Sequence, residues 1–202
     1  MSKKTSVPKK TEDKISNKTS NKVTNKTTKK FGGMVLFLNR DNINTDEIIP
    51  AKYLTLIEKL PLKPHLLEDL KLEGFTPSQI KFDDYSAVVS RSNFGCGSSR
   101  EMAPWAFEVN GINTIIASNF ARIFRENAFN CGMLAIELDS KIINDIFTKF
   151  QSKETAIKVD IDKKELEFQS GTEKMNVKFK LNAFEEDLVR AGGWVELASQ
   201  KY

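Results

Sequence analysis

The chain has 202 residues, of which 40% are hydrophobic and 29% are charged, and its formal net charge is +4. Two Cys and one His are too few for an iron–sulfur cluster, a multi-histidine zinc site or a histidine-centred catalytic triad within this chain. No apolar run is long enough to cross a bilayer, so we expect a soluble protein without a membrane partner.

The first 30 residues form a basic tail. They contain ten Lys, two acidic residues and ten Ser or Thr, so this tail carries +8 and the other 172 residues carry −4 of the total. With so few apolar side chains the tail cannot offset the entropy lost on ordering. We therefore predict disorder over residues 1–30 and one folded domain over residues 31–202.

The charge of the tail leaves two other roles open. A lysine-rich segment can bind nucleic acid or an acidic surface, and a basic N-terminus can direct import into an organelle. However, the tail has no aromatic side chains on which bases stack, and it has no Arg and no clear amphipathic face. We therefore expect a cytoplasmic protein with no nucleic-acid partner.

After the tail, an apolar strand is predicted at residues 34–38, followed by a polar loop at 41–50 and a short helix over 61–72. From residue 85, strands and helices alternate, which favours parallel strands joined by right-handed crossovers. The alternating elements are strands 85–90, 113–118 and 133–138 and helices 98–110, 119–130 and 140–150.

The last third of the chain has a different pattern. Polar breaks separate three short strands, which predicts an antiparallel meander over residues 156–161, 164–169 and 174–180. A final helix is predicted over 183–191, because Gly192 and Gly193 provide a normal C-terminal stop. Together the two patterns indicate an α/β fold with a mixed sheet.

The most informative segment, Ser92–Glu101, reads Ser-Asn-Phe-Gly-Cys-Gly-Ser-Ser-Arg-Glu and lies at the turn from a predicted strand to a predicted helix. Its glycines, Gly95 and Gly97, permit positive φ and close approach of a ligand to the backbone. Its two serines stand where a helix exposes unpaired N–H groups, and Arg100 offers a planar fork of donors for a carboxylate or phosphate. The segment therefore predicts an anion site.

A simpler interpretation is a capped turn, with Ser98 as the N-cap and Glu101 closing a capping box. Gly-Ser-Ser alone favours the cap, whereas the complete string with Arg100 favours binding, and a capping serine can also face a ligand. Cys96 either lines this site or packs beside it. Cys131 is expected in the core, and His65 is expected in an exposed connection without a role.

Three strings carry a resemblance to a known family. The string Asn93–Glu101 resembles the signature of the aconitase superfamily's swivelling domain in its free-standing form, the small subunits of 3-isopropylmalate dehydratases and of related homoaconitases. The strings Asp41–Leu54 and Asn119–Ala128 resemble the first active-site loop and the helix after the signature. The similarity runs from about residue 34 to residue 194. One difference is Met102, where the family usually has His.

The resemblance implies a three-layer β/β/α fold of the aconitase-type swivelling domain. It also implies a hydro-lyase that moves a hydroxyl group between neighbouring carbons of a small dicarboxylic acid, here 2- and 3-isopropylmalate in leucine biosynthesis. In such enzymes a [4Fe–4S] cluster is carried by a large subunit. The chain is therefore expected to be active only with that partner, as a heterodimer or heterotetramer, and to bind no metal itself.

By the same resemblance, Ser98 is the catalytic base and Asp46 orients a group of the large subunit. Without the family, a turn or helix cap is the favoured role for Asp46. Substrate binding is expected from Arg100, Ser99, Thr45 and Gly97.

Substrate choice is expected to depend on the loop formed by Tyr53, Leu54, Thr55 and Leu56. Leu54 and Leu56 suit an apolar pocket for an isopropyl group, and this loop has no Arg for the extra carboxylate of homocitrate. An apolar pocket discriminates only modestly, so a homoaconitase or another methylmalate-type dehydratase stays open.

Overall fold

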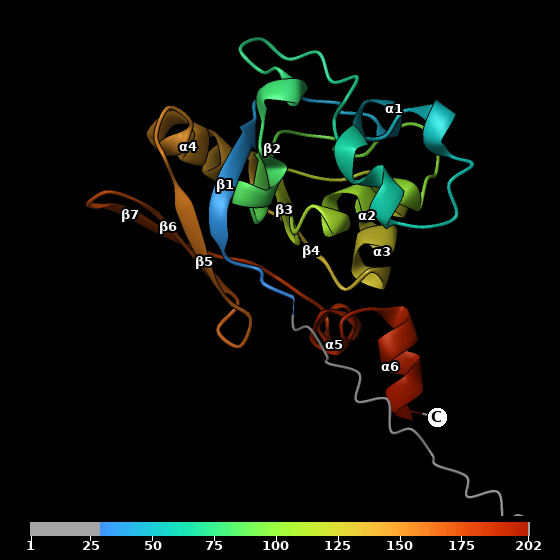
Figure 1. The fold of residues 1–202 in the computed structure, drawn as a ribbon. Helices are drawn as coiled ribbons and strands as arrows, with labels where there is room; N and C mark the ends of the chain where they lie inside the picture. Colours follow the sequence, from blue (N-terminus) through green and yellow to red (C-terminus); the bar gives the residue numbers. More distant parts are fainter. Residues whose placement is uncertain (1–28, 202) are drawn as a thin grey trace, which may run out of the picture.

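The structure is a computed structural model that describes residues 29–201. It contains one seven-stranded sheet in the order β4-β3-β2-β1-β5-β6-β7 (Figure 1). The strands are β1 (Gly33–Leu38), β2 (Ala87–Ser90), β3 (Thr114–Ala117), β4 (Leu134–Glu137), β5 (Ala156–Asp160), β6 (Glu165–Ser170) and β7 (Glu173–Lys178). Strands β1 to β4 are parallel, and β5 to β7 form an antiparallel meander that joins the sheet through β1. The predicted α/β fold with a mixed sheet is confirmed.

Some of the helices connect the parallel strands, and the last two helices form the C-terminal part of the described chain. Figure 1 shows α2 and α3 on one side of the parallel strands and α4 on the other. The α-helices are α1 (Thr45–Ile48), α2 (Met102–Val109), α3 (Arg122–Asn130), α4 (Ser140–Phe150), α5 (Ala183–Ala191) and α6 (Trp194–Lys201). The 3-10 helices are η1 (Ala51–Tyr53), η2 (Leu60–His65), η3 (Pro77–Gln79) and η4 (Phe82–Asp84).

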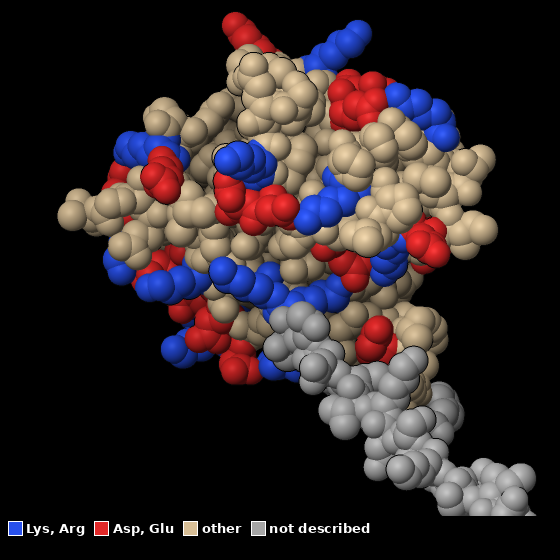
Figure 2. All heavy atoms as spheres, viewed as in Figure 1, with Lys and Arg blue, Asp and Glu red and all other residues tan. Residues whose placement is uncertain are grey.

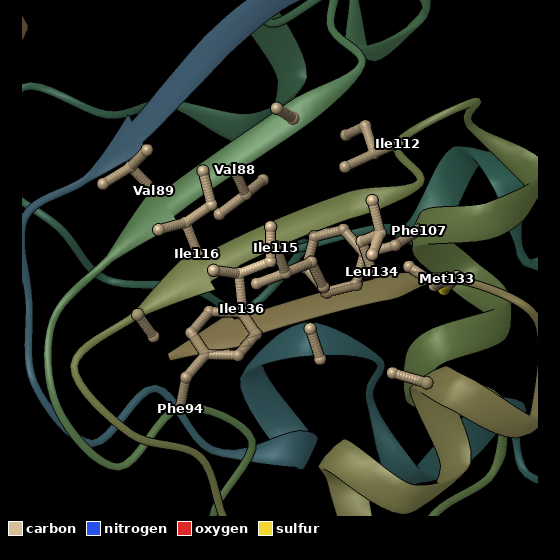
Figure 3. Close-up of a cluster of buried hydrophobic side chains, with 14 of the residues drawn as sticks. Val88, Val89, Phe94, Phe107, Ile112, Ile115, Ile116, Met133, Leu134 and Ile136 are labelled. Atoms are coloured by element: carbon tan, nitrogen blue, oxygen red, sulfur yellow. The ribbon is translucent and has the colours of Figure 1, made fainter. Parts of the chain in front are cut away.

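The main core lies around the parallel strands. Every residue of β2 and β3 is buried, which is the pattern of parallel strands covered on both faces. Figure 3 shows Val88, Ile115 and Ile136 from three neighbouring strands packed together with Phe94 and Phe107. Phe94 belongs to the Ser92–Glu101 segment, so the predicted anion site is attached directly to the core.

Helix α2 begins four residues later than predicted. Residues 98–100 are not helical, and Glu101 occupies the N-cap position without a side-chain cap hydrogen bond. The alternative interpretation, a capping box formed by Ser98 and Glu101, is therefore wrong. Pro104 gives the reason: proline is tolerated in the first turn of a helix, whereas a start at residue 98 places it in the interior. The site serines thus lie on an extended loop ahead of the helix.

Two other expectations need correction, and one helix was not expected. The predicted loop 41–50 contains α1, which Asn44 and Glu47 close with a capping box. The predicted helix 61–72 is instead the 3-10 helix η2 followed by turns, because Pro61 and Pro64 remove backbone donors. Helix α6 was not predicted.

The expectation for the basic tail of residues 1–30 lies outside the described residues, except at its last two positions. There, the side chain of Lys29 forms an ion pair with Glu108, and the carbonyl of Lys30 accepts a hydrogen bond from Asn113 at 3.2 Å.

Candidate functional site

The site forms at the edge of the sheet where β1, β2 and β3 end. Because parallel strands end at the same edge, the loops that follow them meet there. The loop after β1 pairs with the loop after β2: the N–H of Asn42 donates to the carbonyl of Ser92 at 2.9 Å, and the N–H of Gly95 donates to the carbonyl of Ile43 at 2.8 Å. The N–H of Thr45 extends this ladder to the Cys96 carbonyl at 2.8 Å.

The loop after β3 joins on the other side. The N–H of Phe94 donates to the carbonyl of Asn119 at 3.2 Å, and the N–H of Ala121 donates to the carbonyl of Phe94 at 3.0 Å. The Asn119 side chain also accepts from the N–H of Asn93 at 2.7 Å. Backbone pairing on both sides therefore fixes the Ser92–Glu101 segment before any ligand binds.

Gly95 is required by the tight packing of this segment. Its φ is +74°, and a Cβ atom at this position lies 2.2 Å from the ring of Phe124. Gly97 also has positive φ, +93°, but has ordinary space around it. A side chain at residue 95 is therefore excluded by sterics, whereas residue 97 is a glycine mainly for its backbone conformation.

These loops surround a pocket of about 230 Å³. Five of the residues predicted from sequence line it: Thr45, Gly97, Ser98, Ser99 and Arg100. The rest of the wall is formed by Gly95, Ala121, Arg122, Ile123 and Phe124. A larger groove of about 720 Å³, between β1 and residues 72–75 and 151–155, contains none of the predicted site residues.

Ser98 presents an exposed hydroxyl group to the pocket. Its side chain makes no hydrogen bond within the described part of the chain, while its carbonyl accepts from the hydroxyl of Thr45 at 2.9 Å. The N–H groups of Gly97, Ser98 and Ser99 donate to no group among residues 29–201, so they are free for a ligand or water. Because α2 starts only at Met102, these N–H groups belong to the loop that carries the serine and not to the first turn of that helix.

Arg100 is a largely buried cation of the site. Its side chain is 11% exposed, and its Nη1 lies 2.5 Å from Oδ1 of Asp46 and 3.4 Å from the carbonyl of Ile49. Asp46 lies in α1, and the cap of that helix comes from Asn44 rather than from Asp46. The carboxylate of Asp46 is 54% exposed and does not line the pocket. Helix α1 therefore sets the orientation of the guanidinium group.

The predicted specificity loop does not line this pocket. The ring of Tyr53 stacks on His65 with centroids 3.7 Å apart, and its hydroxyl donates to Glu68 at 2.8 Å. Leu56 packs against the core and Leu54 is 36% exposed. His65, expected in an exposed connection, is instead partly buried and lies 2.7 Å from Glu68 through its Nδ1.

A single carboxylate holds this cluster together. Glu68 also accepts from Lys52 at 2.6 Å, and this hydrogen bond is the main reason why the pKa of Glu68 is lowered to about 2. The start of the specificity loop is therefore attached to the turn after η2.

The two cysteines behave differently. Cys131 is buried, which raises the pKa of its thiol to about 11, so its expected place in the core is confirmed. Cys96 is partly buried and does not line the pocket; burial raises the pKa of its thiol as well. Within residues 29–201, no group of three or more His, Cys, Asp or Glu side chains is arranged to bind a metal ion.

Sequence reasoning missed the wall that α3 contributes. Arg122, Ile123 and Phe124 line the pocket, and Arg122 forms an ion pair with Glu126 at 3.1 Å. The signal was present in the string Asn119–Ala128, but only the pairing of Phe94 with Phe120 brings that string to the site.

The arrangement suits a small carboxylic acid. The residues that line this pocket include Arg100, three hydroxyl residues and the backbone of residues 97–99 with its free N–H groups, and each of these groups hydrogen-bonds carboxylate oxygens. Among the helices of residues 29–201, none combines the length and hydrophobicity needed to span a membrane.

Comparison with known proteins agrees with this chemistry. The family model for the aconitase C-terminal domain matches residues 10–141. The chain is 35% identical over 161 residues to the 3-isopropylmalate dehydratase small subunit of Thermodesulfovibrio yellowstonii, covering 80% of this chain and 89% of the relative. It is 36% identical over 149 residues to the protein of the same name from Marinobacter nauticus, covering 65% of this chain and 69% of that one.

A solved structure has the same fold. The 3-isopropylmalate dehydratase (leuD) of Methanocaldococcus jannaschii superposes with a TM-score of 0.68 at 30% identity, covering 85% of this chain and 94% of that one.

Proposed function

We propose, because this chain belongs to the aconitase-type family of 3-isopropylmalate dehydratase small subunits, that it is the small subunit of a hydro-lyase acting in leucine biosynthesis. The enzyme interconverts 2-isopropylmalate and 3-isopropylmalate by dehydration and rehydration. The observation that carries this assignment is the convergence of Ser98, Arg100 and Thr45 on one pocket next to free backbone N–H groups. A cytoplasmic location is part of the same proposal.

The reaction needs two catalytic functions, a base and an electrophile. A proton beside a carboxylate is very weakly acidic, and hydroxide is a poor leaving group, so a base and an electrophile must act on neighbouring carbons. A [4Fe–4S] cluster held by the large subunit supplies the Lewis acid when the complex is assembled. The residues of this chain supply the base and the carboxylate clamp.

Ser98 is the base in this proposal. A serine accepts a proton only if its alkoxide is stabilised, and the free N–H groups of residues 97–99 and the guanidinium of Arg100 are the donors available for that purpose. The hydroxyl is not engaged by any described side chain, so it is free to face the substrate.

Arg100 binds a substrate carboxylate, with Ser99, Thr45 and Gly97 completing the contact. The two N–H groups of the guanidinium fork can bind both oxygens of one carboxylate and so fix its orientation. Such positioning is a large part of catalysis. Asp46 forms an ion pair with Arg100, which supports a role for the Asp46 side chain in positioning Arg100. This role is additional to the expected contact of Asp46 with the large subunit.

Tyr53, Leu54, Thr55 and Leu56 remain the proposed specificity loop. In this conformation they lie outside the pocket, so the proposal requires the substrate or the large subunit to extend the site toward them. A homoaconitase or another methylmalate-type dehydratase is the alternative. Parallel assays with 2-isopropylmalate and homocitrate distinguish these activities.

The test is reconstitution with the large subunit encoded in the same organism. The complex is expected to isomerise 2-isopropylmalate, and either chain alone is expected to be inactive. Ser98→Ala should lower kcat by roughly a thousandfold, within the range of general base catalysis, without loss of complex formation. Ser199→Ala, at an exposed serine of α6, is the matched control. Full activity of the Ser98 variant excludes the serine as the base.

A further inference from the structure

The segment Leu54–Leu60, which we call the apolar loop, exposes large aliphatic side chains. Leu54 is 36% exposed, Ile57 is 92% exposed and Leu60 is 70% exposed. Three of the seven large hydrophobic side chains exposed among the described residues thus lie within seven consecutive positions. In Figure 1 this loop projects at the right edge of the molecule after α1, and Figure 2 shows mainly uncharged side chains there.

The apolar loop is fixed at both ends. At its start, Glu68 holds Lys52 and Tyr53 through hydrogen bonds of 2.6 and 2.8 Å. At its end, the ammonium of Lys59 lies 2.7 Å from Glu108 of α2 and 5.3 Å above the ring of Trp105. The exposed aliphatic side chains are therefore carried on an anchored backbone, which lowers the entropy lost when a partner binds.

The anchors also remove the positive charge of this region. Lys52 and Lys59 are already paired with carboxylates of the same chain, and Glu58 is left as a carboxylate without an ion pair among residues 29–201. The centre of a binding surface is depleted of charged residues, and Glu58 is the one unpaired charge that the apolar loop carries among the described residues. The expected partner surface is therefore apolar and not acidic.

The apolar loop is linked through the chain and through α2 to the residues that hold Arg100. It follows Ile49, whose carbonyl receives Arg100, and it ends on Glu108, at the far end of the helix that follows Arg100. On the other side of the opening, Ile123 lines the pocket and is 40% exposed. A protein that covers the pocket and extends along α2 reaches the apolar loop.

We propose that Leu54, Ile57 and Leu60 are the docking surface by which this chain binds its large subunit. The inference rests on the proposed function, because that function requires the large subunit to cover the pocket. Exposed apolar side chains that lie next to one another, rather than singly, mark sites of protein–protein interaction. A second copy of this chain is the competing occupant, and it is distinguished by the test below.

The test measures the affinity of the full-length chain for the purified large subunit by titration calorimetry. Ile57→Glu is expected to raise Kd at least tenfold, since it places a charge in an apolar contact, and its exposure means that the fold is not affected. Val195→Glu on α6 is the matched control, because Val195 is 73% exposed on another helix; its Kd should stay within twofold of the wild type.

Three results overturn the proposal. Equal Kd values for the Ile57 variant and the wild type exclude the loop from the interface. Equal weakening by both variants shows that the effect is not specific to the loop. A wild-type chain that is dimeric without the large subunit, and monomeric as Ile57→Glu, assigns the loop to a second copy.

Failure of this inference is distinct from failure of the proposed function. Ser98→Ala should bind the large subunit with wild-type Kd but without turnover. If that pattern holds while Ile57→Glu binds normally, only the docking surface is wrong. If the wild-type chain does not bind the large subunit, both are wrong.

Discussion

The parallel strands β1 to β4 and the antiparallel meander β5 to β7 belong to one sheet but differ in what they contribute to the pocket. All ten residues of the small pocket come from the loops after β1, β2 and β3 and from the helices that follow, whereas the meander contributes none. Parallel strands end at one edge and gather their loops there, whereas hairpins place successive turns at alternate ends. The comparison predicts that stability and catalysis can be changed separately in this chain.

The two regions also differ in how they are buried. The central parallel strands are covered on both faces, but β6 alternates between buried and partly exposed residues. The open face of the meander carries ion pairs such as those of Glu167 with Lys158 and Lys174, at 3.0 and 3.4 Å. Exposed pairs of this kind contribute little to stability, so the meander depends on its few buried apolar side chains, of which Phe168 is the largest.

The largest effect is expected from Phe168→Ala. Phe168 is fully buried on β6 and stacks on Phe150 with ring centroids 5.8 Å apart. Removing this ring should lower the free energy of unfolding by about 4 kcal/mol, measured by urea denaturation. The folded fraction should keep its activity with the large subunit. Loss of kcat in folded protein would contradict the separation of the two regions.

A pair of glycine substitutions compares the two regions directly. Gly95→Ala should destabilise the fold by roughly 3 kcal/mol, because the new methyl group overlaps Phe124 and φ is positive. Gly171→Ala, in the β6–β7 turn, also has positive φ, +55°, but its Cβ meets no atom within 4 Å, so about 1 kcal/mol is expected. Thermal unfolding of both variants measures the difference. Equal losses in the free energy of unfolding would mean that the positive φ, and not the overlap with Phe124, determines the cost of Ala at both positions.

Arg100→Lys should lower kcat/KM by about a hundredfold, which corresponds to about 2.7 kcal/mol. Lysine keeps the charge but loses the fork that binds a carboxylate in two directions. Arg190→Lys is the control in the other region: Arg190 pairs with Asp162 and Glu186 at 2.6 and 2.8 Å, far from the pocket residues in sequence. Steady-state kinetics with 2-isopropylmalate should leave this control unchanged. A similar loss in both variants would place the effect outside the pocket.

The smallest effect is expected from Glu68→Gln and depends on pH. The pKa of Glu68 is lowered to about 2 in the folded state by Lys52, so its stabilisation is present above its unfolded pKa, near 4.3, and is lost as pH falls toward 2. The contribution should stay below about 1 kcal/mol because the pair is partly solvated. Urea denaturation should show a difference from the wild type at pH 7 that shrinks at pH 2.5. A constant difference would mean that the charge of Glu68 is not involved.

Much of the fold was predictable because its signals are local. The strands of the parallel half are short apolar runs, and α4 has the predicted bounds 140–150, with Asp139 as its N-cap in the structure. The five pocket residues were also predictable, since they lie in two short strings with unusual composition.

What could not be predicted depends on contacts between distant parts of the chain. The ion pair of Arg100 and Asp46 joins residues 54 positions apart, and the wall from α3 depends on the pairing of Phe94 with Phe120. Pro104 favours a start of α2 near residue 102, whereas the glycine-serine pattern before it favours an earlier start, and the structure follows the proline. Tyr53 lies away from the pocket because its hydroxyl donates to Glu68, and no sequence pattern indicated a role for Glu68.

The ion pairs of Glu108 have a practical consequence for recombinant work. Lys29 and Lys59 both bind this one carboxylate, so the segment before β1 and the loop after η1 share an anchor. A shortened protein that starts at Phe31, the boundary suggested by composition, lacks Lys29. Lys59 is then the one remaining ion-pair partner of the Glu108 carboxylate among the described residues. Truncation before Lys29 preserves the native balance and is the safer design for measuring subunit assembly.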